Sequence, residues 1–172
     1  MLTEAKQLNF EYGAIKKIAS IFHNTNIQEV FDLEKILKPM GAKIICMSPL
    51  EFEKNNNFFK AYGENNFEIS TVDQSDTKFK RVLLAQGLGH YVLHSQRGKY
   101  PCMVSKISGS IAAREGFYFS LALLLPDEIM IKIIKDGFTN EQISNMFRVP
   151  EKIVEIKKLI LTKGLENFKN GY

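Results

Sequence analysis

The segment from Leu84 to His94, with the sequence LAQGLGHYVLH, constrains the fold of this 172-residue chain more than any other. It predicts a helix that begins after a capping residue near Asp73 and runs to about His94. Gly87 and Gly89 each destabilise such a helix by about 1 kcal/mol relative to alanine. Packing must therefore hold the helix in place, and we expect it to lie buried at the centre of the fold.

The same segment has the frame of an H-E-x-x-H zinc-peptidase helix. In a working helix the two histidines bind zinc, and the glutamate beside the first histidine deprotonates the metal-bound water. Gln86 stands at the first histidine position and Gly87 at the glutamate position, so only His90 remains. Because a neutral amide is a poor zinc ligand and glycine has no side chain, the sequence predicts weakened metal binding and no general base.

A second motif, EGFYFSLALLLP from Glu115 to Pro126, follows the first along the chain. In order and spacing, the two motifs resemble those of the ImmA/IrrE family of zinc metallopeptidases. That family shows a helix like L-A-H-E-L-G-H-Y-L-L-H and then one like E-A-N-x-F-A-x-x-L-L-M-P, whose glutamate is the third metal ligand. By this resemblance Glu115 stands at the third ligand position, and Phe117 replaces the usual asparagine.

The resemblance implies a fold class and a domain organisation. We expect an α+β fold: a mainly helical zincin-like metallopeptidase domain with a small antiparallel sheet and a helix-turn-helix-like C-terminal pair. The degenerate metallopeptidase-like domain is expected over residues 1–137. The C-terminal helical pair, packed on it, is expected over residues 138–172.

His90, His94 and Glu115 are the candidate metal ligands. The two histidines are four residues apart, so they can share one helix face and form a shifted His/His/Glu set with Glu115. The alternative is structural, because the family commonly has a histidine at position 94 besides its ligands, and His90 can pair with Glu115 without a metal. We favour the structural interpretation and expect no bound cofactor, with zinc as the alternative.

Periodicity and capping residues predict the remaining elements. Helices are expected at Thr3–Phe22, Ile27–Leu37, Ile111–Leu125, Asp127–Lys135, Thr139–Phe147, and from Val149 to about Gly164. A buried strand is expected at Ile44–Met47, and a hairpin is expected from Phe58–Tyr62 and Phe67–Val72. His23, just beyond the first helix, is expected to cap it or to face solvent.

The composition is that of a globular protein, because 45% hydrophobic and 24% charged residues can build both a core and a charged surface. No apolar run approaches the roughly 20 residues that a membrane span needs, so we expect no membrane partner. The N-terminal sequence lacks the pattern of a secretory signal, and we expect a cytoplasmic protein. Cys46 and Cys102 are then expected to be free, buried thiols.

The motif losses favour a pseudoenzyme that binds a protein partner, such as a repressor-like regulator, without hydrolysing it. By resemblance, a prophage or transcription-regulatory setting is expected. One alternative is a zinc-dependent endopeptidase that uses the shifted site. The other is a DNA-associated regulator acting through lysines of the last helix, but Glu151 and Glu155 offset these charges and a nucleic-acid partner is the weaker interpretation. These lysines are Lys152, Lys157, Lys158 and Lys163.

Overall fold

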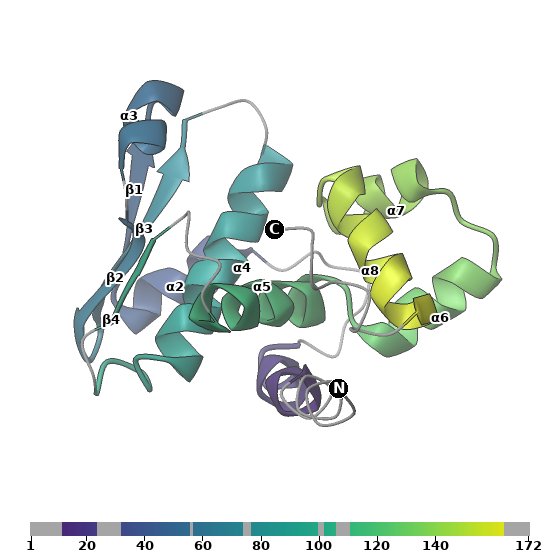
Figure 1. Cartoon of the computed structure of the whole chain (residues 1–172), viewed down its shortest axis with the longest axis horizontal. Helices are drawn as coiled ribbons and strands as arrows, with labels where there is room; N and C mark the ends of the chain where they lie inside the picture. The colour runs from purple at the N-terminus through teal and green to yellow at the C-terminus, as the bar shows by residue number, and fades with distance from the viewer. Residues whose placement is uncertain are drawn as a thin grey trace. The chain divides into compact units, whose positions relative to one another are not determined.

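The computed structural model describes residues 12–23, 32–55, 57–73, 77–99, 102–105 and 111–163 (Figure 1). These residues belong to two compact units. We call Phe31–Phe117 the sheet unit, and Met1–Val30 together with Tyr118–Tyr172 the helical unit. The expected domain boundary between residues 137 and 138 falls within the helical unit, and it stays a prediction.

The sheet unit is built on a four-stranded mixed sheet with the strand order β1-β3-β2-β4. The strands are β1 (Ala42–Met47), β2 (Asn57–Gly63), β3 (Asn66–Val72) and β4 (Cys102–Ser105). The expected hairpin is confirmed as β2 and β3, but the small sheet is mixed and not purely antiparallel, because β1 runs parallel to β3. Helix α3 (Pro49–Lys54) carries the chain from β1 to β2, and β3 then fills the position between them.

The described part of the sheet unit also contains α2 (Leu33–Leu37), α3, α4 (Thr77–Leu93) and the first half of α5 (Ile111–Leu124). Helix α2 continues into the 3-10 turn η1 (Lys38–Met40). The described part of the expected helix Ile27–Leu37 begins at Leu33, where the Asp32 side chain accepts the N–H of Glu34; residues 24–31 lie outside the described residues. We expected no helix at α3, although Ser48 and Glu51 form a capping box around Pro49.

The turn of the β2–β3 hairpin is fixed by α4 and by the loop that follows it. The Tyr91 hydroxyl accepts the Asn65 N–H at 3.1 Å and donates to the carbonyl of Arg97 at 3.0 Å. Gly98, at φ +87°, approaches so closely that a Cβ would lie 2.2 Å from the Gly63 carbonyl oxygen. Only glycine suits this position, because both the backbone angle and the space exclude a side chain.

The helical unit contains the helical segment 12–20, the second half of α5 (Ile111–Leu124), α6 (Asp127–Lys135), α7 (Asn140–Phe147) and α8 (Glu151–Lys163). The expected helices agree with these bounds, and the capping box of Thr139 and Gln142 is present. Residues 3–11 and Gly164 lie outside the described residues. The apolar residues of this part of α5 and the residue after it form core; Phe119, Leu121, Leu123 and Leu125 are fully buried.

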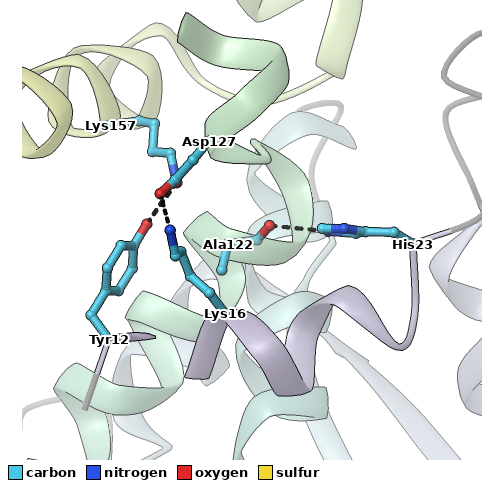
Figure 2. A network of polar contacts seen from close by, with 6 residues as sticks. All are labelled: Tyr12, Lys16, His23, Ala122, Asp127 and Lys157. Atoms are coloured by element: carbon cyan, nitrogen blue, oxygen red, sulfur yellow. Dashed lines mark hydrogen bonds and ion pairs between the residues drawn. The ribbon is translucent and has the colours of Figure 1, made fainter. Parts of the chain in front are cut away.

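His23 caps a helix, but not the one that precedes it. Its Nε2 lies 3.1 Å from the carbonyl oxygen of Ala122, near the end of α5 (Figure 2). This carbonyl has no helical partner, because the residue four positions later is Pro126, which has no N–H to donate. The side chain of His23 therefore supplies the donor that the sequence of α5 lacks.

Cys46 and Cys102 are free as expected, but neither is buried: Cys46 is exposed and Cys102 is half-buried. No helix within the described ranges is long and apolar enough to cross a membrane.

Candidate functional site

Helix α4 presses its motif segment directly against the sheet (Figure 1). At Gly87, a Cβ atom would lie between 2.5 and 2.9 Å from three side-chain atoms of Ile69 in β3, closer than real Cβ atoms approach other atoms. Gly87 is therefore the residue that permits this contact. The position that carries the glutamate in an H-E-x-x-H helix is packed against an isoleucine, while Gln86 beside it is half-buried.

His90 is almost completely enclosed, with 1% of its surface exposed. The rings of Phe58 and Phe59 each lie 5.5 Å from the imidazole, centroid to centroid. On α5, Gly116 lies so close that a Cβ there would be 2.4 Å from Nε2 of His90. Burial, and then the neighbouring His94, lower the pKa of His90 to about 3, so this imidazole is neutral at pH 7.

His94 joins His90 to Glu115. Nδ1 of His94 lies 2.9 Å from Nδ1 of His90, and Nε2 of His94 lies 2.7 Å from a carboxylate oxygen of Glu115. An ionised carboxylate only accepts hydrogen bonds, so His94 donates from Nε2, and the two Nδ1 atoms share a single proton. We call the series of contacts His90–His94–Glu115 the relay. The side chains of His94 and Glu115 are 17% and 23% exposed, so the Glu115 end of the relay lies at the protein surface.

The three candidate ligands thus lie together, but as a chain of contacts in which His94 stands between His90 and Glu115. A zinc site needs donor atoms that converge on one point about 2.0–2.2 Å away. In the relay His94 uses both of its ring nitrogens, one toward His90 and the other toward Glu115. Within the described part of the chain, no group of three or more His, Cys, Asp or Glu side chains is arranged to hold a metal ion. The donor arrangement does not fit zinc, and metal binding by these residues stays a prediction.

The fold and the site define a class. The chain is an α+β, mainly helical metallopeptidase-family domain in which α4 packs on a small mixed sheet. The family model of the IrrE N-terminal-like domain matches residues 72–157, half of the chain. The chain therefore belongs to this peptidase family, as its two motifs indicated. A search of curated proteins finds no match.

The DNA-associated alternative, which was the weaker one, counted Lys157 among four basic residues of the last helix. Lys157 is fully buried, and its Nζ contacts the carboxylate of Asp127 and the hydroxyl of Tyr12 (Figure 2). Burial lowers the pKa of Lys157, although the charge of Asp127 opposes the shift. Lys158 is half-buried with Nζ 3.4 Å from the carbonyl of Phe138. The packing of α8 thus removes Lys157 from any surface.

The cluster around Lys157 was not foreseen from the sequence. Lys16 binds the second oxygen of Asp127 at 2.5 Å, and the Tyr12 hydroxyl lies 3.3 Å from the first. Tyr12 and Lys16 are four residues apart, which is a visible helical spacing, but their partners lie more than a hundred residues away along the chain. Burial raises the pKa of Asp127, but Lys157 and Lys16 outweigh it and the net pKa is lowered.

Proposed function

We propose that this protein is a non-hydrolysing member of its peptidase family and binds a protein partner without cutting it. The observation that carries the proposal is the relay, in which the side chains available as ligands satisfy one another. In this arrangement no ring nitrogen of His94 remains for a metal. Hydrolysis also needs a group that takes a proton from water, and Gly87 offers none at the family's position.

The loss of the base alone has a large expected effect on rate. A positioned general base contributes about 10²–10⁴-fold to catalysis, and the metal contributes further by acidifying its bound water. Neutral His90 is enclosed by Phe58, Phe59 and Gly116, so it cannot approach a substrate in this conformation. The retained frame is therefore better explained by binding than by turnover.

The partner that we propose is a protein, in particular a repressor-like regulator. Support comes from the family resemblance, because the family cleaves regulators of this kind, and a regulatory or prophage setting belongs to the same proposal. Binding without cleavage is the behaviour to look for.

The first experiment measures metal and cleavage together. The purified protein is dialysed against micromolar zinc, its zinc content is determined by elemental analysis, and cleavage of repressor-type proteins from the source genome is followed on gels. We expect far less than one zinc per chain and no cleavage above that of the Glu115→Ala variant. Binding of one such regulator, measured by calorimetry, would support the partner. One zinc per chain, with cleavage that Glu115→Ala abolishes, would refute the proposal.

A zinc endopeptidase with a shifted site is the second candidate, because His90 lies within hydrogen-bonding distance of His94, and His94 lies within hydrogen-bonding distance of Glu115. It requires His94 to leave the relay so that one nitrogen of each ring faces a shared ion. The matched variant is His94→Gln, which keeps a hydrogen-bonding side chain but removes the imidazole. In this candidate the variant loses both zinc and cleavage, whereas in the preferred one neither changes.

A further inference from the structure

We infer that the side chain of Ile69 fills the space that a glutamate at residue 87 would need. Changing residue 87 alone therefore cannot restore the glutamate that the family carries at this position. This inference rests on the proposed function and names the residue that closes the site. The sequence suggests two losses, at Gln86 and Gly87. The structure adds a third position, on a different element, that must change with them.

The contact between Gly87 and Ile69 cannot be relieved by rotating the isoleucine. A Cβ at residue 87 would lie 2.5 Å from Cδ1, 2.7 Å from Cγ1 and 2.9 Å from Cγ2 of Ile69. Cγ1 and Cγ2 both branch from Cβ, so a change of χ1 moves one away only by moving another group nearby. β-branched side chains are also stiff at χ1. The side chain therefore has no simple way to vacate the space.

The backbone of Ile69 is fixed as well. β3 is an inner strand of the sheet, and Ile69 pairs with Ile44 of β1 on one side and with Phe59 of β2 on the other. Ile69 is fully buried. Withdrawing β3 from α4 would disturb both ladders, so the conflict at residue 87 must be met by moving α4 or by making residue 69 smaller.

A glutamate at residue 87 meets a further obstacle beyond its Cβ. Its carboxylate would enter the apolar contact between α4 and β3, where an ionised group is strongly destabilising unless it is paired. The double change Gln86→His with Gly87→Glu should therefore lower stability instead of rebuilding a site. Adding Ile69→Ala to that pair should return part of the lost stability.

The test is a double-mutant cycle on the full chain, read as the thermal unfolding midpoint. Gly87→Ala alone should lower the midpoint by roughly 2–10 °C, because it overpacks a filled contact. In an Ile69→Ala background the same change should have little effect or raise the midpoint, since the new methyl group occupies vacated space. Gly13→Ala is the control: Gly13 is helical, and no atom of the described residues lies within 4 Å of where its Cβ would be, so the midpoint should stay the same or rise slightly.

Equal effects of Gly87→Ala in both backgrounds would overturn the inference. If Gly87→Ala fails to fold, folding of the Ile69→Ala/Gly87→Ala protein supports the inference, and its failure while Ile69→Ala folds contradicts it. Ile69→Val, which removes only Cδ1, gives a milder version of the cycle. Failure of the cycle and failure of the proposed function can be told apart, because a wild-type protein that binds zinc and cleaves would refute the function even if the cycle shows strong coupling.

Discussion

Removing the carboxylate of Asp127 should destabilise the protein far more than removing the partly exposed charge of Lys16 beside it. The Asp127→Ala variant leaves Lys157 fully buried with the Tyr12 hydroxyl, 2.7 Å away, as its remaining contact in the cluster. Removing one partner of a buried ion pair typically destabilises by about 3–5 kcal/mol. The charge of Lys157 then has no counter-charge in the cluster.

An upper limit on this loss follows from the ability of Lys157 to give up its proton. Deprotonating a lysine whose unfolded pKa is about 10.4 requires about 1.36 kcal/mol per pH unit, which is roughly 4.6 kcal/mol at pH 7 and 1.9 kcal/mol at pH 9. Burial lowers the pKa of Lys157 and the Asp127 charge opposes this shift, so removing Asp127 should lower the folded pKa further than in the wild type. The variant therefore regains more stability than the wild type as the pH rises toward the unfolded pKa. The deficit of Asp127→Ala should therefore shrink to about 2 kcal/mol by pH 9.

Urea denaturation followed by far-ultraviolet circular dichroism, at pH 7 and pH 9, measures both quantities; the chain has no tryptophan for a fluorescence assay. Lys16→Ala is the matched control, because Lys16 is 37% exposed and solvent screening limits its ion pair to less than about 1 kcal/mol. The double variant Asp127→Ala/Lys157→Met should recover much of the loss. A deficit no larger than that of Lys16→Ala, or one that does not shrink at pH 9, would refute the buried-charge account.

Three further perturbations test individual contacts. Tyr91→Phe keeps the stacking on Phe67 but loses the hydroxyl that joins the hairpin turn to the loop after α4, and the free energy of unfolding should fall by about 1–2 kcal/mol in urea titrations. Gly98→Ala should be more severe, about 2–5 kcal/mol, because it combines a left-handed backbone with a clash at the Gly63 carbonyl; a wild-type melting temperature would contradict this. His23→Ala should lose about 1 kcal/mol by leaving the Ala122 carbonyl without its donor, whereas His23→Gln, which can still donate, should lose less.

Much of the fold could be predicted because its signals are local. The helices from α5 to α8 are marked by capping residues, Pro126 and Gly137, and the hairpin by its Gly/Asn turn, so their bounds follow from short windows of sequence. α3 carries a local signal too, in Ser48, Pro49 and Glu51, but it lies inside a polar stretch that also suits a loop. β4 has no such signal, since its four residues become a strand through pairing with β2.

The residues of the candidate site could be grouped from the sequence, but which of them contacts which could not be predicted. His90, His94 and Glu115 could be grouped because the two histidines share a helix face and the second motif supplies the acid. The order of the relay depends on side-chain directions that spacing does not determine. Ile69 could not be assigned to the site at all, because a buried strand residue becomes relevant only when the helix packed on it lacks a side chain. The burial of Lys157 could not be predicted either, because lysine is rarely buried and its partners Tyr12 and Asp127 lie far away along the chain.

The relay is also consistent with the proposed loss of the metal. In a zinc peptidase the ion joins the motif helix to the next helix through its ligands, and losing it would leave buried polar groups unpaired. Here the hydrogen bonds from His90 to His94 and from His94 to Glu115 connect α4 to α5 directly. Hydrogen bonds to a charged group contribute about 1.5–3 kcal/mol and neutral ones about 1 kcal/mol, enough to hold two packed helices in register. With the relay on one side of α4 and the Gly87–Ile69 contact against the sheet, α4 is held by its own neighbours, so the proposed non-hydrolysing protein needs no metal ion to keep this helix in place.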